Sequence, residues 1–145
     1  MDGTYRRETS AGYLTNWAAR LLTRSLERRL AGGNAGYMPV FFALIDGKPA
    51  TQSELARWAA VEQPTMANTL ARMERDALIA RAPDPDDKRS SVITLTSLGL
   101  EKGKIAMKAA IETNALALGA LKASERALFL DFMKRMIATL EADRG

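Results

Sequence analysis

The 145-residue sequence contains neither cysteine nor histidine. Without cysteine the chain can form no disulfide and offers no thiolate for redox sensing or nucleophilic catalysis. Without histidine it lacks the commonest general base, and a Ser-His-Asp mechanism and a Cys/His zinc site are both excluded. An enzyme built from this chain would depend on carboxylates, lysine or serine alone. The composition therefore favours a protein that is not an enzyme and holds no cofactor.

Long hydrophobic runs are also missing. No apolar stretch approaches the roughly 18–20 residues of a membrane span, and the N-terminal sequence MDGTYRRETS lacks the apolar core of a signal peptide. We therefore expect a cytoplasmic protein with no membrane partner. Hydrophobic residues make up 47% of the chain, too many for a disordered protein, and the length fits one domain over residues 1–145.

The net charge of +4 permits a nucleic-acid partner but does not identify one. Residues 49–96, which hold the segment interpreted below as the DNA reader, contain six bases and seven acids, a balance of −1. The net charge of this segment therefore does not indicate DNA binding, which depends on the direction in which individual side chains point.

Helical spacing of apolar residues predicts helices at both ends of the chain. The first covers Tyr13 to Leu30, with an apolar stripe of Leu14, Trp17, Ala18, Leu21, Leu22, Leu26 and Leu30. A short apolar helix over Val40 to Ile45 follows, with Pro39 in its first turn. Thr96 and Ser97 cap a long helix over about Leu98 to Leu121, and Ser124 caps the last one. That last helix carries Leu128, Phe129, Phe132, Met133, Met136, Ile137 and Leu140 at 4-3-4-3 spacing.

The middle of the chain has the pattern of a helix-turn-helix. Thr51 and Glu54 form a capping-box pattern that starts a helix through about Ala59, with Leu55 and Trp58 directed inward. After a short turn, Gln63-Pro64-Thr65 opens a second helix that buries Met66, Leu70 and Met73. Two strand-like runs follow, Leu78 to Ala82 and Ser91 to Leu95. A hairpin directly after a helix-turn-helix is a wing, so the predicted fold class is mainly α with a small β-hairpin (α+β).

The face of the second helix opposite its buried side carries groups that suit DNA. These are Gln63, Thr65, Asn68, Thr69 and Arg72. Amides can pair with adenine and guanidinium with guanine in the major groove, while hydroxyls suit phosphates. The alternative is the ordinary solvated face of an amphipathic helix.

The hairpin tip, DPDDKRSS at residues 84–91, allows three interpretations. Arg89 can pair with Asp87, which would hold a guanidinium ready for the minor groove, with Lys88 on a phosphate. A solvated turn with weak surface ion pairs is the second interpretation. A calcium loop of Asp84, Asp86 and Asp87 is the third, but no Gly-x5-Glu follows, so we expect no metal.

This stretch resembles the MarR family of winged-helix transcription regulators. The family pattern, D-x-R followed by five residues and L-T, is matched from Asp87 to Thr96, and Gly99 also fits. The run PTMANTLARMERDALI, residues 64–79, is similar to the family's recognition helix and its exit into the wing. The family usually has glycine where this chain has Ala77; a left-handed residue there would cost alanine about 1 kcal/mol relative to glycine, so a differently shaped turn is one expectation.

The resemblance implies a homodimer that binds a pseudo-palindromic operator in double-stranded DNA, usually as a repressor, and is released by a small ligand. It divides the chain into a winged helix-turn-helix at residues 38–99 and N- and C-terminal dimerisation helices at 10–36 and 100–145. The two terminal apolar stripes then become a dimer seam, although intramolecular core remains the alternative.

The resemblance also implies an effector pocket for an aromatic or phenolic ligand where the helical part meets the winged part. Its predicted residues are Trp17, Arg20, Tyr37, Met38, Phe41 and Phe42, with Arg20 as the cation. The alternative is that these aromatics are plain core. A winged-helix module that binds protein rather than DNA is the competing function, and a hydrolase has no paired-carboxylate spacing in its favour.

Overall fold

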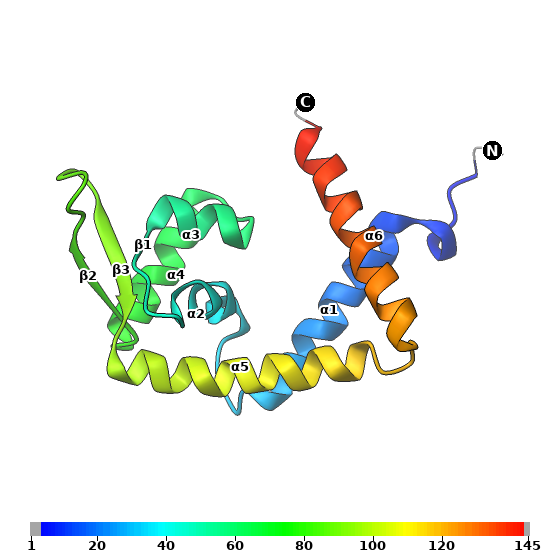
Figure 1. Cartoon of the computed structure of the whole chain (residues 1–145), viewed down its shortest axis with the longest axis horizontal. Coiled ribbons are helices and arrows are strands. Elements are labelled where there is room, and N and C mark those ends of the chain that lie inside the picture. The colour runs from blue at the N-terminus through cyan, green and yellow to red at the C-terminus, as the bar shows by residue number, and fades with distance from the viewer. Residues whose placement is uncertain (1–3, 144–145) are drawn as a thin grey trace. The chain divides into compact units, whose positions relative to one another are not determined.

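The structure, a computed structural model, describes residues 4–143 and consists mainly of helices with one small antiparallel sheet (Figure 1). The elements in chain order are η1 (Arg7–Thr9), α1 (Ala11–Arg29), η2 (Ala35–Tyr37), α2 (Met38–Leu44), β1 (Ala50–Thr51), α3 (Gln52–Ala59), α4 (Gln63–Arg75), β2 (Ile79–Pro83), β3 (Ser91–Leu95), α5 (Ser97–Ala117) and α6 (Ala123–Ala142). The predicted α+β class with a winged helix-turn-helix is confirmed. No helix within residues 4–143 is both long enough and apolar enough to cross a membrane.

The chain divides into two compact units within α5, one ending at Ile111 and the other beginning at Glu112. The first unit contains the helix-turn-helix and the hairpin, and the second contains the end of α5 and all of α6. The predicted functional boundary after residue 99 concerns DNA binding and dimerisation, and it stays a prediction.

Side-chain caps begin α3 and α5 where the sequence places them. The Thr51 hydroxyl accepts from the Glu54 amide at 3.2 Å while the Glu54 carboxylate accepts from the Thr51 amide at 3.4 Å, which completes the capping box of α3. The Thr96 hydroxyl accepts from the Gly99 amide at 2.9 Å at the start of α5. Pro39 lies in the first turn of α2, and Pro64 in that of α4.

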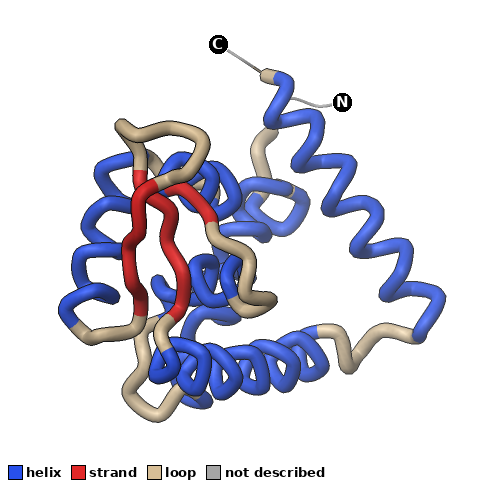
Figure 2. The backbone as a smooth tube through the Cα atoms, turned by 60° about the vertical axis from the view of Figure 1, so that its left-hand side comes forward, coloured by secondary structure: helices blue, strands red, loops and turns tan. Residues whose placement is uncertain are grey.

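The sheet has the strand order β1-β3-β2, and its strands lie side by side in Figure 2. Strands β2 and β3 form the predicted hairpin, with Arg81 opposite Ile93 at its centre. The sequence did not predict β1, in which Ala50 pairs with Ile93 and Thr51 with Val92. This short third strand fixes the start of α3 to the hairpin, because Thr51 is also the cap of that helix.

The core of the first unit lies between α2, α3, α4 and the sheet. Its fully buried side chains include Val40, Leu44, Leu55, Leu70, Met73 and Ile93. The predicted inward residues of α4 are all buried, with Met66, Leu70 and Met73 at most 2% exposed. Leu26 and Leu30, near the end of α1, pack against this core.

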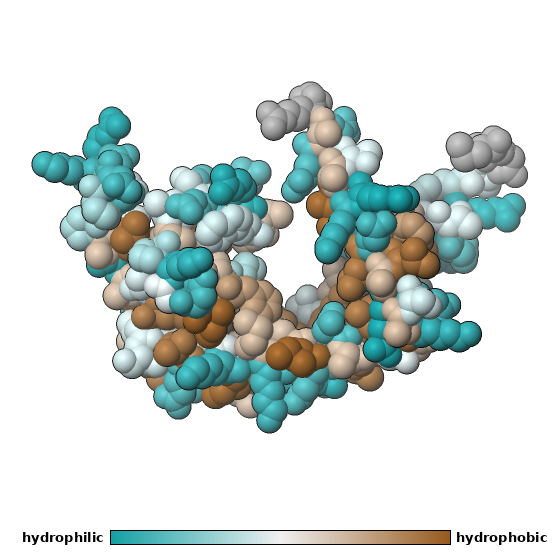
Figure 3. All heavy atoms as spheres, viewed as in Figure 1, coloured by the Kyte–Doolittle hydropathy of each residue, from teal (hydrophilic) through white to brown (hydrophobic). Residues whose placement is uncertain are grey.

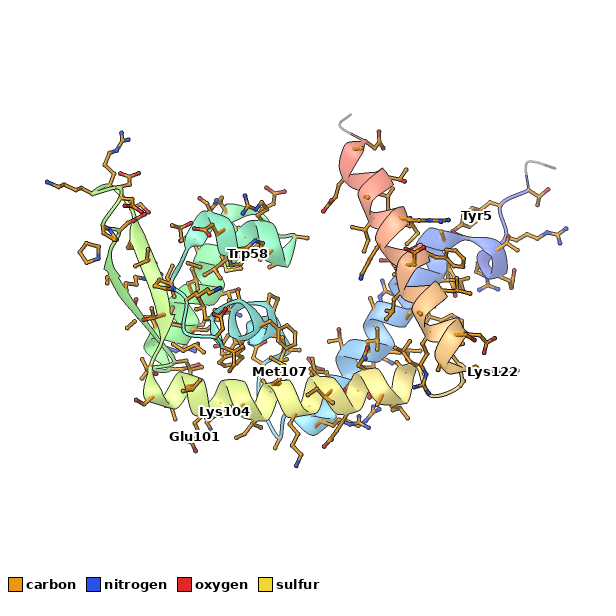
Figure 4. The ribbon with its side chains drawn as sticks, in the orientation of Figure 1. Tyr5, Trp58, Glu101, Lys104, Met107 and Lys122 are labelled. Carbon is orange, nitrogen blue, oxygen red and sulfur yellow. The ribbon has the colours of Figure 1, made fainter. Side chains whose placement is uncertain are left out.

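Three local predictions were wrong. Trp58 is 53% exposed on α3 (Figure 4) because Leu55 and Ala56 supply the buried face of that helix. Ser124 is not a cap: α6 begins at Ala123, and Lys122 stands at the N-cap position with its amide bound by the Glu125 carboxylate at 2.8 Å. Helix α5 ends at Ala117 rather than Leu121, and turn bonds from Gly119 to Leu116 and from Leu121 to Leu118 follow it.

Candidate nucleic-acid interface

Helix α4 turns the predicted polar face away from the core. Gln63, Thr65, Asn68 and Arg72 are exposed, and Thr69 is half-buried with its hydroxyl donating to the Thr65 carbonyl at 3.1 Å. The side chains of Asn68 and Arg72 take part in none of the hydrogen bonds or ion pairs found among residues 4–143. Their amide and guanidinium therefore keep their full bonding capacity for an external partner.

Gln63 differs from the other four residues. Its Oε1 accepts from Gln52 Nε2 at 3.1 Å, and its Nε2 donates to Ser53 Oγ at 3.0 Å. The amide of Gln63, the first residue of α4, is thus held by the first two residues of α3.

The hairpin tip is a turn organised by its own aspartates. Asp84 Oδ1 accepts from the Asp86 amide at 2.9 Å, and Asp87 Oδ1 accepts from the Arg89 amide at 3.0 Å. The Asp84 amide donates to the Ser90 carbonyl at 3.1 Å and closes the loop. The tip is covered by hydrophilic side chains (Figure 3). The Asp84 and Asp87 carboxylates therefore accept hydrogen bonds from backbone amides within the same turn.

Arg89 has the predicted contact with Asp87. Its Nε lies 3.5 Å from Asp87 Oδ1, while the Arg89 side chain is 93% exposed and the Asp87 side chain 48% exposed. A surface ion pair of this kind contributes only about 0–1 kcal/mol to stability. It biases the direction of the guanidinium and leaves most of its donors open to solvent.

Three contacts at the base of the wing involve the end of the recognition helix and the two residues, Ala77 and Leu78, that lead from it into the wing. Arg81 Nε of β2 lies 2.7 Å from Glu74 Oε2 in the last turn of α4. The Thr96 hydroxyl donates to the Ala77 carbonyl at 2.6 Å, and the Thr96 amide donates to the Leu78 carbonyl at 3.0 Å. These contacts hold the hairpin against the C-terminal end of α4.

Ala77 adopts the left-handed conformation, with φ of 60°. The Ala77 amide donates to the Glu74 carbonyl at 3.0 Å and the Leu78 amide to the Met73 carbonyl at 2.8 Å, which is the Schellman pattern that glycine normally completes. The expectation of a differently shaped turn was wrong. The turn keeps this shape, and alanine bears its conformational cost.

A cavity of about 450 Å³ lies in the first unit, between the end of α1, α2, the end of α4 and the start of α5. Tyr37, Met38 and Phe41 line it, as predicted, and Asp76 and Lys102 add charged groups. The other three predicted pocket residues, Trp17, Arg20 and Phe42, do not line it and are exposed to solvent. Trp17 and Arg20 lie ten or more residues before Leu30, the first residue of the cavity wall, and Phe42 is exposed on α2. Lys102 therefore takes the place expected for Arg20 as the cation of the cavity.

Tyr37 links this cavity to the end of the recognition helix. Its hydroxyl donates to Asp76 Oδ2 at 3.0 Å, and its side chain is buried. Burial raises the pKa of the Tyr37 phenol above its ordinary value, and the bond to the Asp76 carboxylate raises it further. The phenol is therefore neutral at physiological pH and acts as the donor.

The sequence did not indicate three side chains that contact the interface or the cavity, namely Gln52, Lys102 and Arg81. Lys102 was overlooked because α5 was interpreted only as a dimerisation helix. Its position three residues after Gly99, on the same helical face, was the available signal. Among residues 4–143 no group of three or more acidic side chains gathers closely enough to hold a metal ion.

Comparisons with known proteins agree with this geometry. A family model described as MarR family matches residues 44–91. The HTH-type transcriptional repressor NicR of Pseudomonas putida is 33% identical over 95 residues, which cover 66% of this chain but only 60% of NicR. The transcriptional regulator HosA of Escherichia coli is 32% identical over 100 residues, covering 69% of this chain and 74% of HosA.

Solved structures share the fold over nearly the whole chain. BpsR of Bordetella bronchiseptica, from a study of how 6-hydroxynicotinic acid regulates its DNA binding, has a TM-score of 0.83 at 21% identity and covers 99% of this chain and 100% of that one. A mutant of MarR from Escherichia coli, complexed with operator DNA, has a TM-score of 0.78 at 21% identity and covers 86% of this chain and 91% of that one. At these identities the likeness establishes the fold alone.

Proposed function

We propose that this protein binds DNA. The reason is that the chain belongs to the MarR family of transcriptional regulators, which are not enzymes. In this proposal the protein acts in the cytoplasm as a homodimeric repressor on a pseudo-palindromic operator. The observation that carries it is the combination of an outward polar face on α4 with an exposed Arg89 on the wing that Asp87 contacts. Two such elements can enter adjacent grooves of one duplex.

Each side chain has a distinct role in this proposal. Asn68 and Arg72 have open hydrogen-bonding groups and read base edges in the major groove. Thr65 contacts a phosphate near the start of α4, and Thr69 contacts a second one after its hydroxyl turns from the Thr65 carbonyl to donate to the phosphate. Arg89, oriented by Asp87, enters the minor groove, and Lys88 neutralises a phosphate.

Homodimerisation is supported by apolar side chains that each unit leaves in solvent. On α1 these are Leu14, Trp17, Leu21 and Leu22, and on α6 they are Leu128, Phe129, Phe132, Ile137 and Leu140. Exposed apolar residues in continuous stripes favour an interface rather than a solvated surface. A two-fold dimer would also present two recognition helices to the two halves of a palindrome.

We further propose that the cavity binds a small aromatic acid. Its apolar walls, which include Met38 and Phe41, suit a ring, and the Lys102 ammonium suits a carboxylate. The BpsR study names 6-hydroxynicotinic acid as the regulator of that protein, which makes this acid a reasonable first probe.

The DNA-binding proposal is tested by selecting bound duplexes from a random pool and titrating the selected sequence against salt. We expect a two-fold symmetric sequence and an affinity that falls steeply with salt, because each neutralised phosphate contributes about −0.9 to the logarithmic slope. A flat salt dependence would favour a protein-binding module instead.

Two substitutions then separate base contacts from backbone contacts. Asn68→Ala should weaken binding by about tenfold and relax selectivity at one base pair in each half-site, whereas Arg89→Ala should weaken binding to all sequences by a similar factor. Lys104→Ala is the matched control, because Lys104 projects from α5 away from the helix-turn-helix (Figure 4). Negligible effects of both test substitutions would refute the assigned roles.

Ligand binding is tested by calorimetry with 6-hydroxynicotinic acid and 4-hydroxybenzoic acid. Lys102→Met should weaken binding by about tenfold, since a charge-assisted hydrogen bond is lost. Lys104→Met removes the same charge from the same helix outside the cavity and should change nothing. Equal affinities of the two variants would exclude Lys102 as the carboxylate partner.

A further inference from the structure

The first turns of α3 and α4 are joined by a chain of three polar side chains. Gln52 Nε2 donates to Gln63 Oε1 at 3.1 Å, and Gln63 Nε2 donates to Ser53 Oγ at 3.0 Å. Gln52 and Ser53 are the first two residues of α3, and Gln63 is the first residue of α4. The three residues therefore connect the two helices of the helix-turn-helix at the end where the recognition helix begins.

Both heteroatoms of the Gln63 amide are engaged by neighbours on α3. An amide nitrogen has two donors and an amide oxygen two lone pairs. Each atom uses one of them, so one N–H and one lone pair remain for an external partner. Because the amide is held at two points, these two groups point in fixed directions.

The order of the bonds couples the orientation of the Gln63 amide to that of the Gln52 amide. Gln52 offers an N–H to the oxygen, and Ser53 offers its hydroxyl oxygen to the nitrogen. A rotation of the amide by 180° would place two donors against each other at Gln52. The two amides can exchange donor and acceptor only together, so the orientation of Gln52 decides which outward group of Gln63 meets a given base edge.

We infer that Gln52 and Ser53 are positioning residues that orient Gln63 for reading one base pair at the start of the recognition helix. This inference rests on the proposed DNA-binding function. It adds two specificity-determining residues on α3, a helix from which no DNA contact was expected. Gln63 is exposed, as a reader must be, and Gln52 is half-buried beside the capping box of α3.

The experiment measures binding to the selected duplex and to the set of its single base-pair substitutions. We expect Gln63→Ala to reduce discrimination at one base pair by about three- to tenfold, the value of one or two neutral hydrogen bonds. Gln52→Ala should reduce discrimination at the same base pair. The double variant should match Gln63→Ala alone, because the positioning residue acts only through the reader.

The variant Gln52→Glu should change which base is preferred, an effect that a loss of stability alone would not produce. A carboxylate at this position accepts rather than donates, so it favours the rotated Gln63 amide, with the nitrogen toward residue 52 and the Ser53 hydroxyl donating to the oxygen. The outward donor and acceptor exchange places, and the preferred base at that pair should change. The added negative charge should weaken binding to every sequence alike, and Arg57→Gln, an equal charge change on the exposed side of α3, measures that uniform part.

Substitutions of Ser53 that keep or remove its hydroxyl provide a second test of the positioning role. Ser53→Thr should keep the discrimination of the unaltered protein, whereas Ser53→Ala should lose part of it. Circular dichroism and thermal unfolding of each variant confirm that the fold is intact. If the unaltered protein binds DNA selectively but Gln52→Ala and Gln52→Glu leave the base preference unchanged, the inference is wrong and the proposed function stands. If the unaltered protein selects no duplex, both fail.

Discussion

Three alanines show at the scale of single residues where this chain carries backbone strain. Ala31, Ala60 and Ala77 have φ of 50°, 54° and 60°, and each lies at or just after the C-terminus of a helix. A left-handed conformation costs an alanine roughly 1–2 kcal/mol, whereas glycine adopts it freely. Glycine loses part of this advantage through its larger entropy in the unfolded chain.

We predict that Ala77→Gly stabilises the protein by about 0.5–1 kcal/mol, the difference between these two terms. The free energy of unfolding, measured by denaturant titration, checks it. Ala71→Gly is the matched control, because Ala71 is an exposed residue inside α4 and glycine there should destabilise by about 1 kcal/mol. Destabilisation by Ala77→Gly would mean that the turn at residue 77 does not carry the strain assigned to it.

Tyr37 yields a prediction that depends on pH. Tyr37→Phe removes the hydrogen bond to Asp76 and should cost about 1 kcal/mol at neutral pH. Because burial and Asp76 raise the phenol's pKa in the folded state, the folded protein resists ionisation and the unfolded chain does not. The advantage of tyrosine over phenylalanine is therefore fully present below the ordinary pKa of about 10 and is lost as pH rises through the folded value. Unfolding titrations of both proteins from pH 7 to 11 measure the difference, and an advantage that grew with pH would contradict the assignment.

Single-residue predictions from the sequence succeeded where a side chain acts locally. Asp87 and Arg89 are two residues apart, so their contact depends on a short turn that the sequence specifies. Lys102 was missed and Arg20 wrongly chosen because the cavity joins segments that are up to 76 positions apart in the chain, from Leu30 to Ala106. Sequence periodicity states which face of a helix is apolar but not which neighbour that face meets.

At the scale of elements, the contact between the wing and α5 depends on Gly99. A Cβ atom built on Gly99 would overlap the Leu78 carbonyl oxygen, which also accepts from the Thr96 amide at 3.0 Å. The first turn of α5 can therefore lie against the start of β2 only if residue 99 has no side chain. This contact gives a physical reason for the glycine that follows the L-T pair in this sequence.

We predict that Gly99→Ala destabilises the protein by about 1–3 kcal/mol, as overpacking against a rigid backbone does. It should also weaken operator binding through displacement of the wing. Gly12→Ala is the matched control: Gly12 lies in the first turn of α1 with only the Ser10 hydroxyl near its Cβ position, so alanine should stabilise by about 0.5–1 kcal/mol. Thermal unfolding of both variants provides the measurement. Equal stabilisation of the two would show that α5 does not approach Leu78 as closely as the structure places it.

Elements were predictable where capping and hydrophobic period agreed. The starts of α3 and α4 follow from Thr51, Glu54 and Pro64, and the buried face of α4 from Met66, Leu70 and Met73. Strand β1 was not predictable, because two residues carry no period and Thr51 already serves as a cap. The start of α6 was misplaced because serine is a common cap, while here the Glu125 side chain binds the Lys122 amide instead.

At the scale of the whole molecule, the exposed apolar stripe of α6 predicts how the protein associates. Phe132 is 52% exposed at the centre of this stripe, and the Arg135 guanidinium lies 5.1 Å from its ring centroid. A glutamate there would remove the packing of the phenyl ring and bury a charge in a homodimer interface. Such a charge costs at least about 3 kcal/mol, so we predict that Phe132→Glu raises the dimer dissociation constant by about 100-fold or more. Sedimentation equilibrium across a concentration series measures this constant directly.

The matched control for the dimer prediction is Ala138→Glu, an equal charge change on the opposite, exposed face of the same helix. It should leave the dissociation constant unchanged. The proposed operator has two-fold symmetry, so Phe132→Glu should also reduce affinity for the full palindrome much more than for an isolated half-site, where one recognition helix and one wing suffice. If Phe132→Glu instead weakened both DNA targets equally and left sedimentation unchanged, α6 would not form the dimer seam. The exposed stripe of α1, with Leu14 and Leu21, would then be the next surface to substitute.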